Sequence, residues 1–116
     1  MRDLITTTPV RSLLVALLAI VAGGAHAAGN VAAGRAKAPM CAACHGLDGR
    51  SQMPEAPNLA GQVEGYLVAQ LSSFKSGERH NEQMAIIAKA LSPQDIEDVS
   101  AYYASLGSSN AASAHP

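Results

Sequence analysis

The sequence has few of the large aromatic side chains from which small domains build a core. It contains no tryptophan, one phenylalanine and three tyrosines among 116 residues. A short chain buries only a modest fraction of its surface on folding, so a domain with so few large side chains is hard to stabilise alone. We therefore expect a bound group to supply part of the core.

The sequence also lacks an excess of charge of either sign. Eight lysines and arginines stand against nine aspartates and glutamates, which gives a net charge of −1 at pH 7. Proteins that bind nucleic acids present many basic side chains to the phosphates, so this balance gives no reason to expect a nucleic-acid partner. It does not favour a strongly polarised docking face either.

No useful length of the sequence alternates apolar and polar residues with the period of a β-strand, and no internal repeat is present. The sequence therefore predicts an all-α fold with four or so short helices. Helices are expected over residues 31–42, 62–76, 84–88 and 93–106, whereas residues 46–61 are rich in glycine and proline and form a loop.

Several residues mark where these helices begin and end. Gly77 is expected to end the second helix. Ser92 and Asp95 have the spacing of a capping box, and Pro93 stands at the first helical position. Gly107 is expected to stop the last helix, so that residues 108–116 form a flexible C-terminal tail.

Only two cysteines are present, and both lie in the segment Cys41-Ala42-Ala43-Cys44-His45. The pattern C-x-x-C-H is the attachment motif of a c-type haem. Each thiol can add across one vinyl group of the porphyrin, and a helical turn sets the two cysteines at the separation of the vinyls. The histidine that follows can serve as the proximal ligand of the iron. The segment predicts one covalently bound haem, held by Cys41, Cys44 and His45.

Three other interpretations of the cysteine pair are weaker. A redox dithiol normally accompanies a βαβ pattern, which is absent from the sequence. A structural zinc site needs four ligands, usually from two separated pairs, and no second cysteine pair exists. A disulfide is the default for two cysteines in an exported chain, but it gives His45 no role and closes only a very small loop.

The first residues have the layout of a secretory signal peptide. Arg2 and Arg11 precede a short apolar run over residues 13–21, and Ala25-His26-Ala27 forms a small-x-small cleavage signal. The alternative is a membrane anchor, but the uncharged stretch over residues 12–30 contains three glycines and a histidine. We expect residues 1–27 to be a cleaved signal peptide, residues 28–107 to be the haem domain, and no stable membrane insertion after cleavage.

A second axial ligand is expected from a methionine, whose soft thioether favours ferrous iron. Met40 adjoins Cys41 on the proximal side, and Met53 lies only eight residues beyond His45 in a loop. Met84 follows a whole helix, so the chain there can reach the opposite face of the haem. Met84 is the predicted ligand, and His80 is its competitor.

The sequence from Ala28 to about Leu106 resembles a class I c-type cytochrome. It is close to the short bacterial monohaem cytochromes c-553 and to one half of the dihaem cytochromes c4. The resemblance rests on the haem motif followed by Gly46, on Met84, and on three further segments: Pro57-Asn58-Leu59-Ala60-Gly61-Gln62, Phe74-Lys75-Ser76-Gly77-Glu78-Arg79 and Asp95-Ile96-Glu97-Asp98-Val99-Ser100-Ala101-Tyr102-Tyr103.

The resemblance implies a class I cytochrome c fold and a role for several further residues. It makes His45 and Met84 the axial pair, gives the carbonyl of Pro57 a hydrogen bond from the His45 ring, and packs Leu59 on the haem. It also implies a close crossing of the first and last helices.

At this crossing, the resemblance implies that Gly34 is the small residue that lets the helices approach. A residue of the pair Tyr102 and Tyr103 would fill the opposite side. Many relatives carry a large aromatic four residues after the glycine, where this sequence has Ala38. The crossing is therefore expected either to be looser or to depend on both tyrosines.

An iron with both axial positions filled by protein has no open site for a substrate, so the expected function is one-electron exchange rather than enzymatic catalysis. The sequence favours a periplasmic electron carrier between redox proteins, namely a membrane complex or dehydrogenase and a terminal oxidase or reductase. One alternative is a haem-bearing subunit of a dehydrogenase or oxidase complex. Another is a ligand-binding or peroxidatic haem protein with a labile Met84.

Overall fold

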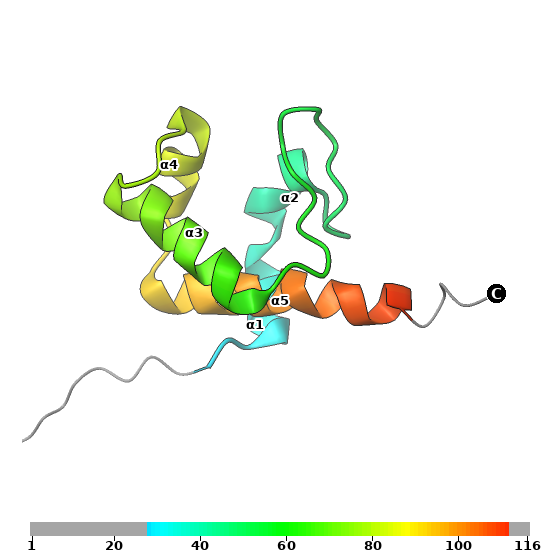
Figure 1. Ribbon diagram of the computed structural model, residues 1–116. Helices are drawn as coiled ribbons and strands as arrows, with labels where there is room; N and C mark the ends of the chain where they lie inside the picture. The colour runs from blue at the N-terminus through cyan, green and yellow to red at the C-terminus, as the bar shows by residue number, and fades with distance from the viewer. Residues whose placement is uncertain (1–27, 112–116) are drawn as a thin grey trace, which may run out of the picture.

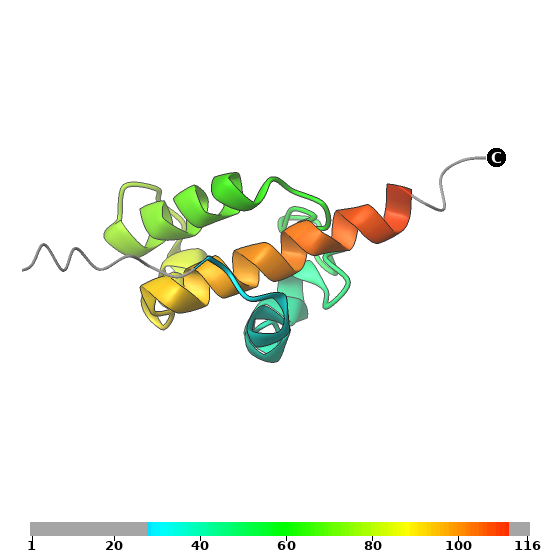
Figure 2. The same cartoon turned by 90° about the horizontal axis from the view of Figure 1, so that it is seen from below.

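The computed structural model describes residues 28–111, which form five α-helices (Figure 1). The bounds are α1 Val31–Lys37, α2 Pro39–His45, α3 Glu64–Ser76, α4 Glu82–Lys89 and α5 Pro93–Ala111. No strand occurs in this part of the chain, and the predicted all-α class is confirmed. Helix α5 is the longest and forms the base on which the others are arranged: α3 lies beside it and α1 crosses it (Figure 2).

The first predicted helix is in fact two helices. Proline has no N–H to donate and its ring crowds the preceding turn, so α1 ends at Lys37 and α2 begins at Pro39. Helix α2 then continues to His45, three residues beyond the expected end. It ends there because Gly46 has a positive φ of 79°, a conformation that glycine adopts without a steric penalty. The haem motif thus occupies its own short helix.

Helices α3 and α4 begin and end at recognisable signals. Helix α3 starts at Glu64, two residues later than expected, and ends as predicted at Gly77, whose left-handed conformation lets its amide donate to the Ser73 carbonyl at 3.1 Å. Helix α4 is longer than the predicted turn. It begins after Asn81, whose side-chain oxygen accepts a hydrogen bond from the Met84 amide at 2.9 Å.

Helix α5 starts at the predicted capping box. The Asp95 amide donates to the Ser92 hydroxyl at 3.0 Å, and the Ser92 amide donates to the Asp95 carboxylate at 2.9 Å. The prediction that Gly107 stops this helix is wrong, because α5 runs through to Ala111. Gly107 serves a contact instead: a Cβ at this position would lie 2.3 Å from Gly61 Cα.

The crossing of α1 and α5 depends on Gly34, as the resemblance implies. A Cβ on Gly34 would lie 1.9 Å from the Asp98 carbonyl oxygen on α5, so no other residue fits without moving one helix. Where many relatives have a large aromatic, this chain has Ala38, and both tyrosines pack beside it. Tyr102 and Tyr103 are buried beside Ala38 with their ring centroids 5.1 Å apart in an edge-to-face arrangement.

Seven of the buried side chains form two hydrophobic clusters. One contains Ala38, Leu67 and the two tyrosines, and the other contains Leu91, Ile96 and Val99. Within the described residues, no helix is both long and apolar enough to span a bilayer.

The predicted domain limits meet the described residues only in part. The predicted signal peptide, residues 1–27, lies outside them, as do residues 112–116 of the predicted tail. The first four residues of that tail, 108–111, belong to α5.

Candidate functional site

The three residues of the haem motif lie together on the last turns of α2. Cys41 and Cys44 are separated by one helical turn, both are half-buried, and their thiols are free rather than joined in a disulfide. Burial raises the pKa of the Cys41 thiol to about 11, so this group is neutral at neutral pH. The site therefore offers two free thiols one helical turn apart, which is the spacing that attachment to two vinyl groups needs.

The His45 ring is buried and oriented by a backbone carbonyl. His45 is 7% exposed, and its Nδ1 lies 2.8 Å from the Pro57 oxygen. A carbonyl oxygen can only accept, so this hydrogen bond requires the ring proton on Nδ1. The lone pair of Nε2 is then available to a metal. The hydrogen bond at Nδ1 also makes the ring more basic, so that Nε2 binds a metal more strongly. This is the contact that the resemblance implies for Pro57.

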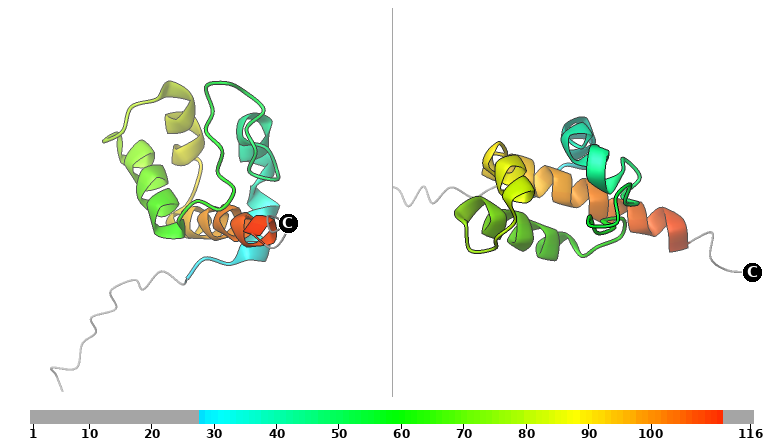
Figure 3. Two further views of the ribbon diagram at one scale, coloured as in Figure 1. Left: turned by 45° about the vertical axis from the view of Figure 1, so that its right-hand side comes forward. Right: turned by 90° about the horizontal axis from the view of Figure 1, so that it is seen from above.

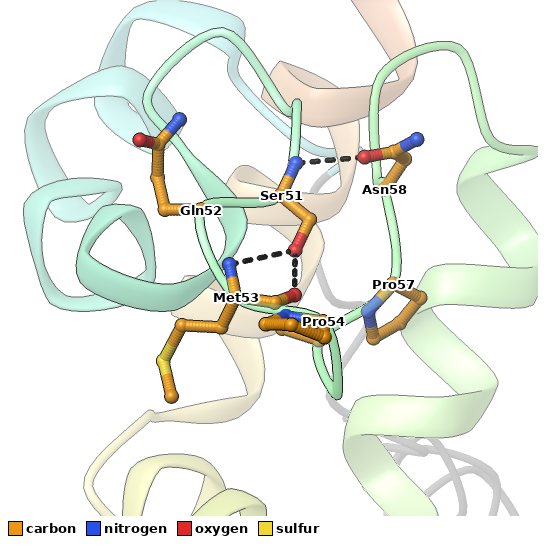
Figure 4. Close-up of a pocket in the computed structure, with 7 residues that line it drawn as sticks. Ser51, Gln52, Met53, Pro54, Pro57 and Asn58 are labelled. Carbon is orange, nitrogen blue, oxygen red and sulfur yellow. Dashed lines mark hydrogen bonds between the residues drawn. The ribbon is translucent and has the colours of Figure 1, made fainter.

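The loop after α2 brings the Pro57 carbonyl to His45. The Gly49 carbonyl accepts hydrogen bonds from the amides of Leu59, at 2.8 Å, and Ala60, at 3.0 Å, which closes the base of the loop. Within the loop, the Ser51 amide donates to the Asn58 side-chain oxygen at 2.7 Å, as Figure 4 shows. These hydrogen bonds within the loop therefore hold Pro57 in its position beside His45.

The same loop encloses a shallow hollow lined by its own residues, which are Ser51, Gln52, Met53, Pro54, Ala56, Pro57 and Asn58 (Figure 4). Ser51 accepts a hydrogen bond from the Met53 amide at 3.1 Å and donates to the Met53 carbonyl. The Met53 side chain is 40% exposed and extends away from Pro57. Met53 thus belongs to the loop that supports His45.

Two tyrosine hydroxyls hold the start of this loop on α5, a feature that the sequence analysis did not anticipate. Tyr103 donates to the Gly46 carbonyl at 3.0 Å, and Tyr102 donates to the Leu47 carbonyl at 2.6 Å. Burial, the largest cause, raises the pKa of Tyr103, so its hydroxyl remains a neutral donor. The residues directly after His45 are therefore fixed to the longest helix.

Met84 lies in a different part of the structure from His45. Its amide is held by Asn81 in the first turn of α4, and its side chain is half-buried. Figures 1 and 3 show α3 and α4 on one side of the molecule and α2 with its loop on the other, both above α5. His80, the competing ligand, is an exposed residue of the loop that precedes α4.

Leu59 is partly buried and packs against the cluster of Ala38, Leu67, Tyr102 and Tyr103, against which Cys41 also packs. It is therefore close to the haem motif, and its packing on a haem stays a prediction. In the range 28–111, no group of three histidine, cysteine or acidic side chains is placed to hold a metal ion.

The chemistry of the donor set fits a c-type haem. Two thiols lie on one helix, the adjacent imidazole keeps its Nε2 lone pair, and a thioether stands on a separate helix. A haem would also supply the large apolar body that the sequence lacks.

Comparison with known proteins points to the same chemistry. The family model described as cytochrome c matches residues 31–107. Cytochrome c4 of Pseudomonas aeruginosa is 49% identical over 98 residues, which cover 83% of this chain and 49% of that relative. Cytochrome c-554(548) of Halomonas halodenitrificans is 42% identical over 81 residues, which cover 67% of this chain and 98% of that relative.

A solved structure shares the fold. The crystal structure of reduced recombinant cytochrome c4 from Pseudomonas stutzeri superposes with a TM-score of 0.64 at 42% identity, covering 67% of this chain and 46% of that one. This chain spans about half the length of the cytochrome c4 relatives that it matches.

Proposed function

The chain belongs to the cytochrome c family, and on that premise we propose that it is a periplasmic one-electron carrier whose haem iron is ligated by His45 and Met84. A covalently bound haem c is the cofactor of this family, and Cys41 and Cys44 fit its attachment motif. The haem supplies the one-electron redox couple. The protein's part is to attach it, fill both axial positions and set its potential.

The hydrogen bond between His45 and Pro57 carries the proposal. At 2.8 Å it holds the imidazole in the tautomer that leaves Nε2 free, in a ring that is only 7% exposed. A buried histidine satisfied at one nitrogen only is suited to be a metal ligand. A thioether from Met84 on the other side would favour the ferrous state and leave no position for a substrate, which supports electron transfer over catalysis.

The partners of such a carrier are other redox proteins. We propose that a membrane complex or a dehydrogenase donates the electron and that a terminal oxidase or reductase accepts it. Without residues 1–27 the chain keeps six basic and eight acidic side chains, and this small net charge of −2 is compatible with short-lived docking to more than one partner. The signal peptide, residues 1–27, would direct export and be cleaved after Ala27. Stoichiometric co-purification with one dehydrogenase or oxidase would instead favour a dedicated subunit.

Absorption spectra of the protein purified from the periplasm test this function. The spectra are recorded for the oxidised and reduced protein, with and without carbon monoxide. We expect a low-spin c-type spectrum, a methionine-to-ferric-iron charge-transfer band, and no change of the reduced spectrum with carbon monoxide. A reduced protein that binds carbon monoxide at once would have an open axial position, and the carrier assignment would be wrong.

A further inference from the structure

The segment that carries Met84, residues 78–91, is fastened to α3 by two basic side chains. At its beginning, the Arg79 guanidinium donates to the Gln70 side-chain oxygen at 2.6 Å and lies 4.6 Å from the centroid of the Phe74 ring. The Arg79 amide also donates to the Ser73 carbonyl at 3.1 Å. Planar guanidinium groups stack well on aromatic rings. The Phe74 ring and the Gln70 side chain therefore hold the Arg79 side chain on α3, and the hydrogen bond to Ser73 holds its backbone there.

The end of the segment is held by Lys75. Its ammonium group donates to the carbonyl of Leu91, which lies two residues beyond α4 and is 1% exposed. A buried carbonyl is costly to leave without a donor, and a hydrogen bond from a charged donor is stronger than one from a neutral donor. Lys75 therefore satisfies a buried acceptor and binds the end of α4 to α3.

Both cations use their charge on neutral acceptors. Within residues 28–111, Lys37 and Asp95 form an ion pair at 3.3 Å, whereas Lys75 and Arg79 form no ion pair. Exposed ion pairs contribute little and tolerate changes of geometry. Charge-assisted hydrogen bonds to an amide oxygen or a backbone carbonyl are shorter and more directional. The arrangement is thus suited to fixing a position.

The link from Arg79 to Met84 is short. Asn81 stands two residues after Arg79, and its side-chain oxygen accepts the hydrogen bond of the Met84 amide at 2.9 Å. A movement of residues 79–81 away from α3 would therefore displace the first turn of α4, where Met84 lies.

We propose that Arg79 and Lys75 are positioning residues for Met84, which hold both ends of residues 78–91 on α3 and so keep the Met84 thioether at the haem iron. This inference rests on the proposed ligation by Met84. The inference also gives a physical role to the segment Phe74-Lys75-Ser76-Gly77-Glu78-Arg79. Phe74, Lys75 and Arg79 make the contacts that hold residues 78–91 on α3, and Gly77 makes the turn between α3 and those residues.

The test uses the holoprotein and the variants Arg79→Leu and Lys75→Met. The control is Lys89→Met, which removes an exposed cation from the end of α4. The first measurement is the rate at which the ferrous protein binds carbon monoxide, which reports how often Met84 leaves the iron. The second is the pH at which the ferric protein loses its methionine charge-transfer band.

We expect each variant to bind carbon monoxide at least about tenfold faster than wild type, since a charge-assisted hydrogen bond that opposes opening is lost. The charge-transfer band should disappear at a lower pH. Lys89→Met should match wild type in both measurements. If Arg79→Leu and Lys75→Met behave like Lys89→Met, the positioning role is overturned.

Two further variants keep the outcome interpretable. Met84→Ala is measured in parallel. If Met84→Ala does not bind carbon monoxide, the proposed axial ligation fails; if it binds and the cation variants do not bind faster than wild type, only the positioning role fails.

The variant Gln70→Ala tests the contact with Arg79. Gln70→Ala leaves the cation in place and should speed carbon monoxide binding less than Arg79→Leu. The double variant should show less than the product of the two effects, because both remove one contact. Fully multiplicative effects would contradict the proposed contact.

Discussion

The Asp98 carboxylate on α5 accepts a hydrogen bond from the backbone amide of Asn30 at 2.8 Å, across 68 residues of sequence. The same oxygen accepts a second hydrogen bond from the Gln94 side chain at 3.0 Å. Asn30 in turn caps α1, since its side-chain oxygen accepts from the Ala33 amide at 2.9 Å. One buried carboxylate thus anchors the beginning of the first helix to the last.

Replacing Asp98 by alanine should lower the stability of the holoprotein. The change leaves the Asn30 amide without its acceptor next to the α1–α5 crossing, and such a loss costs about 1–3 kcal/mol. Glu97→Ala is the matched control, because the Glu97 side chain is half-exposed beside it. Chemical denaturation followed by far-ultraviolet circular dichroism measures the difference, and equal stabilities for the two variants would contradict the anchoring role.

Two glycine-to-alanine variants should have opposite effects. At Gly34, the new methyl group would lie 1.9 Å from the Asp98 carbonyl oxygen, so the helices must separate and stability or haem assembly should fall sharply. At Gly65 in α3, nothing lies within 4 Å of the new Cβ. Gly65→Ala should stabilise by about 0.5–1 kcal/mol through helix propensity. Thermal midpoints and haem content of both proteins test the pair, and a harmless Gly34→Ala would refute the close crossing.

Replacing Cys41 or Cys44 singly by serine should lower the yield of holoprotein, and replacing both should abolish covalent attachment. The reason is that the chain has two cysteines in all, so no other thiol can form a thioether. Acid-acetone extraction separates loose from covalent haem. Haem that stays with the protein of the double variant after extraction would end the c-type assignment.

Replacing Met84 by alanine should lower the reduction potential, because the soft ligand that favours ferrous iron is lost. The reduced variant should also bind carbon monoxide. Met53→Ala and His80→Ala serve as controls and should leave the spectrum low-spin and the potential nearly unchanged, since one residue lies in the loop of Pro57 and the other is exposed. If His80→Ala opens the iron and Met84→Ala does not, the axial pair is two histidines.

Stability should fall with acid partly through the capping box of α5. The hydrogen bond from the Ser92 amide, the largest cause, lowers the pKa of Asp95 below its ordinary value of 3.8, and Lys37 contributes further. A carboxyl group whose pKa is lower when folded stabilises the fold above its ordinary pKa, and this contribution is lost as the pH falls through the folded pKa. Asp95→Asn should therefore flatten the loss of stability below about pH 4, and an unchanged acid profile would show that Asp95 contributes nothing.

Several features could be predicted from the sequence because neighbouring residues decide them. The pair Ser92 and Asp95 closes a capping box with groups three residues apart, and Gly77 ends α3 through its own left-handed backbone. The haem motif is likewise local, since its three functional residues share one helix. Pro39 carried a local signal too: its missing N–H divides the first helix, although the alanine-rich pattern around it suggested a continuous one.

The remaining features were decided only in the tertiary structure, because their partners are distant in sequence. Gly107 continues a helix that its identity would be expected to end, since close contact with Gly61 requires a residue without a side chain. The hydroxyl of Tyr103 reaches the carbonyl of Gly46, 57 residues away, and that of Tyr102 reaches Leu47.

Arg79 and Lys75 illustrate the same division. In the sequence they are two cations near the end of a helix, and charge alone says only that they prefer water. The fold places Phe74, Gln70 and the Leu91 carbonyl around them. The sequence by itself determined the helical class, the haem motif, and the helix ends that are marked locally by Gly77 and by the pair Ser92 and Asp95. The tertiary structure decided how the two sides of the candidate haem site are held, because packing alone brings together groups that the chain keeps far apart.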